Sequence, residues 1–247
     1  MVKGKRSYGW VPDRPDQRDY LYKAIRPVVR LPKKVDLREF CSIVENQETL
    51  GSCTANALAG NLEYLDHRID DVYEDVSRLF IYYNERVLED TVDYDSGASL
   101  RDGIKTLRKQ GACWEKTWPY LIERFTRKPS KKCYAEAKKR RIESYHRINS
   151  LPEMLTCLAE GYPFVFGFTV YESFQSQRVA RTGVANIPKK KEKVLGGHAV
   201  LAVGYNQKQK RFIVRNSWGT KWGKDGYFTM PYEYLETLSA DFWTIRK

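Results

Sequence analysis

Apolar side chains recur at steps of three and four residues in the N-terminal half of the chain, the spacing that gathers them on one face of a helix. Residues 52–69 carry such a stripe at Ala55, Leu58, Leu62, Leu65 and Ile69. Comparable patterns predict three further helices, over 76–89, 99–111 and 150–161. The N-terminal half is therefore expected to be mainly helical.

Residues that begin and end helices support these assignments. Ser52 is a predicted N-cap, which places Cys53 at the first helical position. Ser99 begins the third predicted helix, and Gly111 ends it. In the fourth, Ser150 and Glu153 have the spacing of a capping box.

The pattern changes after the fourth predicted helix. Short segments rich in β-branched and aromatic residues predict strands within 162–171, 197–205, 211–218 and 226–230. Helices followed by strands favour an α+β protein with two unlike halves, over 34–145 and 146–247. Residues 1–33 lack a helical period and contain four prolines. We interpret them as a leader that lies against the rest of the chain.

Composition and charge narrow the function classes. Hydrophobic residues make up 42% of the 247, enough for a core, and no apolar run approaches the length of a membrane span. The start lacks the apolar region of a secretory signal. The net charge is +12, concentrated in the basic runs 127–141 and 188–193. These runs predict either solvated surface or contacts with acidic or nucleic-acid partners, although no aromatic platform accompanies them.

Cys53 is the candidate nucleophile. Backbone N–H groups and the helix dipole favour a thiolate in the first turn of a helix. A thiolate also needs an imidazole as proton acceptor and donor, and His198 follows two glycines at the start of a predicted strand. Asn216 supplies an amide that can orient the ring, beside Trp218. The cysteines lack zinc spacing and no phosphate-binding loop occurs, so we expect neither a metal nor a cofactor.

Three segments resemble the papain and cathepsin family of cysteine peptidases. They are NQETLGSC at 46–53, GGHAVLAVGY at 196–205 and VRNSWGTKWGKDGYF at 214–228. The resemblance implies a papain-like two-domain fold, with a helical half, an antiparallel β-barrel-like half and the active-site cleft between them. It also implies a thiol-dependent peptidase that acts on polypeptides through an acyl-enzyme.

The resemblance assigns roles to individual residues. Cys53 would attack the peptide carbonyl, His198 would act as base and then acid, and Asn216 would orient His198 under Trp218. The side chain of Gln47 and the backbone N–H of Cys53 would form the oxyanion hole.

The resemblance also predicts where a substrate would bind. Gly97, Ala98 and Gly197 would contact its backbone. The leader resembles those of bacterial and some viral relatives. It would be either a short pro-segment lying in the cleft or a scaffold strap that is never removed.

The chain departs from the family pattern at its cysteines. Leu50 replaces a cysteine of the usual signature, and Cys133 has no possible partner between residues 71 and 100. The usual disulfides are therefore expected to be absent, which favours the cytoplasm or another reducing compartment of a bacterial or virus-associated protein.

Two alternatives remain for the function. The same three residues could deamidate, transamidate or ligate, because an amine can resolve an acyl-enzyme as water does. The chain could instead be a non-catalytic binding protein that uses its basic surface.

Overall fold

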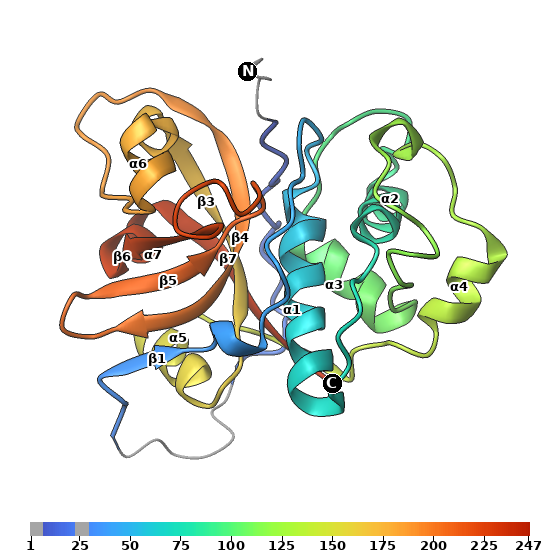
Figure 1. Ribbon diagram of the computed structural model, residues 1–247, viewed down its shortest axis with the longest axis horizontal. Helices are drawn as coiled ribbons and strands as arrows, with labels where there is room; N and C mark the ends of the chain where they lie inside the picture. The colour runs from blue at the N-terminus through green and yellow to red at the C-terminus, as the bar shows by residue number, and fades with distance from the viewer. Residues whose placement is uncertain (1–6, 23–29) are drawn as a thin grey trace.

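The computed structural model describes residues 7–22 and 30–247, so the leader expected over 1–33 is described except for 1–6 and 23–29. Figure 1 shows helices α1–α4 on one side and the sheet on the other. The helices are α1 Cys53–Asp70, α2 Arg78–Glu89, α3 Leu100–Lys109, α4 Lys131–Ala137, α5 Leu151–Ala159, α6 Gln177–Thr182 and α7 Tyr232–Leu238. The strands are β1 Lys34–Asp36, β2 Ser144–Arg147, β3 Phe164–Tyr171, β4 Val194–Asn206, β5 Arg211–Arg215, β6 Tyr227–Pro231 and β7 Ser239–Arg246. This arrangement confirms the α+β prediction.

The seven strands form one antiparallel sheet, in the order β2-β7-β3-β4-β5-β6, with β1 paired to β4. The order runs from β2 to β6 without returning to its start, so the expected antiparallel sheet is present but does not close into a barrel. Phenylalanines of β3 pack against one another and against Phe212 of β5. These rings form the centre of the core on one face of the sheet.

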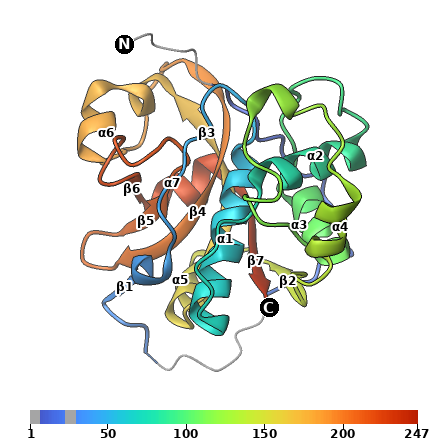
Figure 2. The same ribbon diagram turned by 45° about the vertical axis from the view of Figure 1, so that its right-hand side comes forward.

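Helix α1 lies between the sheet and helices α2, α3 and α4 (Figures 1 and 2). Every residue from Cys53 to Asp66 is buried, because β4 covers one side of the helix and α2 and α3 cover others. The predicted apolar stripe therefore understated the burial of this helix. It was also wrong at Ile69, which is 49% exposed because the last turn of α1 extends beyond the core.

The four predicted helices are present, although α2 begins at Arg78 and not at Val76, and two caps differ from the prediction. Ser52 precedes α1 as expected, but its hydroxyl bonds Tyr120 at 2.6 Å instead of capping the helix. Ser150 caps α5 as expected, yet the Glu153 carboxylate accepts a bond from the Asn149 N–H, one residue earlier than in a capping box.

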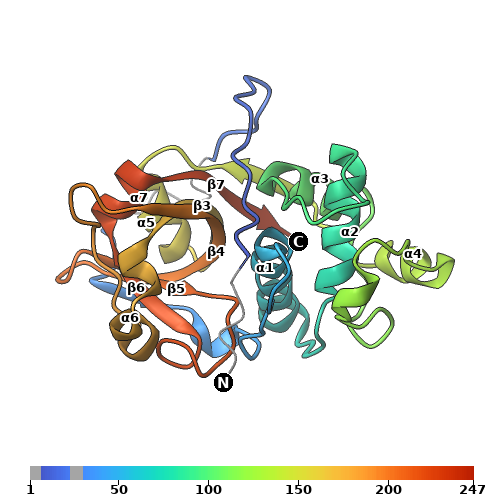
Figure 3. The ribbon, with the colours of Figure 1, turned by 90° about the horizontal axis from the view of Figure 1, so that it is seen from above.

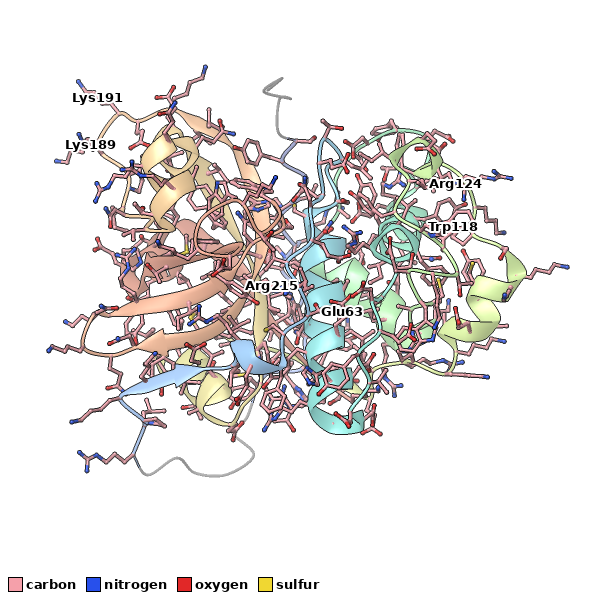
Figure 4. All side chains as sticks on the ribbon, in the orientation of Figure 1. Glu63, Trp118, Arg124, Lys189, Lys191 and Arg215 are labelled. Atoms are coloured by element: carbon pink, nitrogen blue, oxygen red, sulfur yellow. The ribbon has the colours of Figure 1, made fainter. Side chains whose placement is uncertain are left out.

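A buried polar cluster attaches α1 to the sheet. Arg215, at the end of β5, lies 4.0 Å from the Glu63 carboxylate of α1 (Figure 4). The same guanidinium donates to the Ser42 hydroxyl at 3.0 Å and to the Ile43 carbonyl at 2.8 Å. Burial raises the pKa of Glu63, and Arg215 opposes that shift. Because removing one partner of a buried ion pair is costly, this contact holds the two halves in register next to the site.

All five cysteines are free. Cys133 is buried against Cys113, with which its side chain forms a hydrogen bond. Cys133 thus lies beside Cys113 without forming a disulfide with it. No helix in the described part of the chain combines the length and the apolar character needed to cross a membrane.

Candidate active site

The sulfur of Cys53 lies at the N-terminus of α1, fully buried against β4. It receives hydrogen bonds from the backbone N–H groups of Ala199, Gly9 and Thr54, which lower its pKa. Burial outweighs them and raises the pKa to about 11. The thiol is therefore neutral near pH 7 in this covered state, which differs from the thiolate that the helix position predicted.

His198 lies on β4 directly before Ala199, whose N–H contacts the Cys53 sulfur. Its Nε2 is 2.8 Å from Oδ1 of Asn216, an oxygen that also accepts a bond from the Ser217 N–H at 2.9 Å. Trp218 stacks on the imidazole, with ring centroids 4.8 Å apart and an interplanar angle of 25°. The structure thus brings the predicted cysteine, histidine, asparagine and tryptophan together from α1, β4 and the segment after β5.

Gln47 is buried beside this cluster. Its Oε1 accepts a bond from the Ser217 hydroxyl at 2.6 Å, which fixes the orientation of the side-chain amide. The Nε2 group donates to the carbonyls of Leu50 at 2.9 Å and Ser7 at 3.5 Å. The amide predicted to stabilise an oxyanion therefore contacts a carbonyl oxygen of the leader.

The leader runs between the two halves, as Figure 3 shows from above. The Ala98 N–H donates to the Gly9 carbonyl at 2.7 Å, and the Val11 N–H donates to the Ala98 carbonyl at 3.0 Å. The Trp10 N–H donates to the Gly197 carbonyl at 3.1 Å. The backbone groups of Ala98 and Gly197, which we expected to bind a substrate, are thus occupied by residues 9–11.

Glycine is required where the leader crosses Gly97. This residue has φ +72°, and a Cβ atom there would overlap the backbone of Gly9. The ring of Tyr8 packs edge-on against two rings of the site, with its centroid 6.2 Å from that of His198 and 6.5 Å from that of Trp218. The leader therefore covers both the predicted backbone-binding positions and the imidazole.

A second set of contacts anchors the leader farther along its course. Asp13, whose carboxylate is completely buried, accepts bonds from Trp243 Nε1 at 2.8 Å and from the Arg101 N–H at 3.1 Å. Asp19 accepts bonds from Arg101 Nη2 at 2.6 Å and Arg147 Nη1 at 3.1 Å. Arg101 belongs to α3 and Arg147 to β2, so the leader bridges the helical half and the sheet.

These anchoring residues were not identified from the sequence. The acidic residues of the leader were visible, but nothing local distinguishes Asp13 and Asp19 from their exposed neighbours. Their partners Arg101 and Arg147 lie about 80 to 130 positions away. Only the folded chain brings these charges together.

The basic runs lie apart from this cluster. In 188–193 the lysines are exposed, and Lys189 and Lys191 extend outward at the edge of the molecule (Figure 4). In 127–141 most basic residues are exposed, but Arg140 is buried and donates to the Ala112 carbonyl at 2.7 Å. This arrangement favours the interpretation of the two runs as largely solvated surface.

Comparisons with known proteins agree with this geometry. A family profile described as "Papain family cysteine protease" matches residues 31–238. A peptidase C1-like protein of Acanthamoeba polyphaga mimivirus, L477, is 42% identical, with 98% of this chain and 87% of that protein covered. The structure of xylellain, a cysteine protease from Xylella fastidiosa, superposes with a TM-score of 0.91 and 43% identity, covering 100% of this chain and 99% of that one.

More distant relatives share less of the sequence. Cysteine proteinase 3 of Entamoeba histolytica is 28% identical, and the match covers 81% of this chain but 62% of the relative. The bromelain protease of Ananas comosus, at 22% identity and a TM-score of 0.69, shares the fold. These comparisons lend no support to a nucleic-acid partner.

Proposed function

Because the chain belongs to the papain family of cysteine proteases, we propose that it hydrolyses peptide bonds through Cys53, His198 and Asn216. The observation that carries the assignment is the 2.8 Å contact between His198 Nε2 and Asn216 Oδ1. His198 precedes Ala199 on β4, and the Ala199 N–H contacts the Cys53 sulfur. These contacts support the proposal that a nucleophile, a base and an orienting group act together here.

The reaction follows from this arrangement. Since Nε2 of His198 is bonded to Asn216, Nδ1 is the ring nitrogen that takes the Cys53 proton. The sulfur attacks the peptide carbonyl carbon, and the imidazolium then gives the proton to the departing amine. The resulting thioester is hydrolysed by a water molecule, which His198 deprotonates in turn.

Gln47 and the Cys53 N–H stabilise the charge that develops on the carbonyl oxygen. The bond from Ser217 to Gln47 Oε1 fixes the amide before substrate arrives, so little reorganisation is needed during the reaction. The contact between Gln47 Nε2 and the Ser7 carbonyl supports this role, because it is the contact that a substrate carbonyl would make.

The leader has to move before a polypeptide can bind. Residues 7–11 occupy the backbone groups that a substrate would use, and they bury the Cys53 sulfur. The described state is therefore the latent form of the peptidase. Activation occurs either by removal of the leader as a pro-segment or by displacement of a strap that stays attached.

The test combines a covalent probe with a peptide substrate. We expect a thiol-alkylating epoxide to modify Cys53 once the leader is removed or displaced, and peptide hydrolysis to be lost in Cys53→Ala. Labelling of Cys41 alone, or hydrolysis that survives Cys53→Ala, would overturn the assignment. N-terminal sequencing of both proteins separates a removed leader from a permanent strap.

An added amine tests the alternative fate of the thioester. If the acyl group passes mainly to the amine while free acid is minor, the enzyme is a transferase or ligase using the same residues. If neither labelling nor turnover occurs after leader displacement, the chain is a non-catalytic member of the family.

A further inference from the structure

The side chain of Trp10 marks a binding pocket beside the proposed active site. Its ring packs on β3 and β4 at two glycines. A Cβ atom at Gly167 would overlap the indole, and one at Gly197 would lie 2.7 Å from Cε3 of Trp10. Side chains at these two positions would fill the space, so the glycines create room for a large flat group.

A buried carboxylate lies at the far end of this indole. Asp241 of β7 is 3% exposed, and its Oδ2 accepts bonds from Trp10 Nε1 at 3.2 Å and from the Asp13 N–H at 2.8 Å. Its Oδ1 is held by Arg147 Nη2 at 3.0 Å. Both donors to Oδ2 belong to the leader, whereas the donor to Oδ1 belongs to the sheet.

Displacing the leader leaves Oδ2 of Asp241 without these two donors. A substrate side chain that fills the pocket buries this oxygen again, and a buried acceptor without a donor is costly, so a side chain that brings an N–H group to this depth is favoured. The displaced leader also takes Asp13 and Asp19 away from Arg101 and Arg147. The two guanidinium groups then outnumber the single carboxylate of Asp241, so a cationic side chain is disfavoured.

We propose that this pocket selects tryptophan from polypeptide substrates, with Asp241 as the specificity-determining residue. The inference rests on the proposed peptidase function and names its substrate class. The substrate indole takes the place of Trp10 against Gly167 and Gly197, and its N–H donates to Asp241 Oδ2. Phenylalanine and leucine fit the space but leave the carboxylate oxygen without a donor.

The test uses the full chain carrying Trp10→Ala, which empties the pocket and weakens the leader. Hydrolysis of a positional peptide library is measured, together with matched peptides in which tryptophan is replaced by benzothienylalanine, a ring of similar shape that lacks the N–H. We expect kcat/KM for tryptophan to exceed that for benzothienylalanine and leucine about tenfold, with arginine and lysine below tryptophan.

A second variant, in which a larger side chain fills the pocket, tests the inference independently. Trp10→Ala combined with Gly167→Val should lose the tryptophan preference and favour small side chains at the same substrate position, while Cys53 labelling persists. Equal rates for tryptophan and benzothienylalanine, or a preference for arginine, would overturn the inference while leaving the peptidase function intact. Absence of hydrolysis for every peptide would instead overturn the proposed function, and this inference with it.

Discussion

Asp13 makes the leader sensitive to pH. Its carboxylate is buried against Trp243 and Arg101, and Asp241 lies nearby. Burial, and then repulsion by Asp241, raise the pKa of Asp13 from its ordinary 3.8 to about 6. The bonds from Trp243 and Arg101 oppose this shift without cancelling it. The covered state therefore favours the protonated carboxyl.

The sign of the effect follows from linkage. A raised carboxyl pKa means that the covered state binds more protons than the state with the leader displaced, where Asp13 titrates at its ordinary value. Leader binding is thus strongest below pH 3.8 and weakens as the pH rises through 6. A shift of this size corresponds to about 3 kcal/mol, or roughly a hundredfold change in the covered-to-open ratio.

Replacing Asp13 by asparagine removes the titrating charge at similar volume. The measurement is the rate at which dipyridyl disulfide labels Cys53 in the full chain, expressed as the ratio of wild type to Asp13→Asn at each pH. Both proteins carry the same Cys53 thiol, so the effect of its ionisation on the labelling rate cancels in this ratio. We expect a value near one at pH 4 that rises tenfold or more by pH 7.

Two controls keep this measurement specific. Gln17→Ala changes an exposed leader residue and should follow the wild type at every pH. Cys53→Ala reports background labelling of the other cysteines. A ratio that stays flat between pH 4 and pH 7, or that falls as the pH rises, would refute the argument that Asp13 ionisation loosens the leader.

Three further predictions concern the site and the core. Gln47→Ala should lower kcat by about 10²–10³ with little change in folding, as measured by steady-state peptide hydrolysis, because it removes an oxyanion donor; an unchanged kcat would contradict that role. Asn216→Ala should lower activity about 10–100-fold, because His198 loses its orienting partner, and unchanged rates would show that Trp218 alone holds the ring. Phe166→Ala should lower the free energy of unfolding by about 3–5 kcal/mol in urea titration, since the ring is fully buried in the sheet core, and a loss below 1 kcal/mol would contradict tight packing there.

Local patterns were sufficient to predict much of the fold. Helical spacing and caps identified α1, α2, α3 and α5, because the residues that start and stop a helix lie within a few positions of it. Spacing alone could not show that α1 is buried on all sides or that the sheet stays open. Those features depend on which surfaces meet, and many positions separate the residues involved.

The candidate site, like the fold, could be predicted only in part from local sequence. The sequence by itself determined which residue types can do the chemistry, because a nucleophile at a helix start, a histidine beside glycines and an Asn-Ser-Trp-Gly segment are local features. Only the tertiary structure placed the leader across Ala98 and Gly197, raised the pKa of Cys53 by burying it, and joined Asp13 and Asp241 to Arg101 and Arg147. Burial and charge pairing are properties of the assembled chain: they depend on what packs around a group, and no short stretch of sequence contains that information.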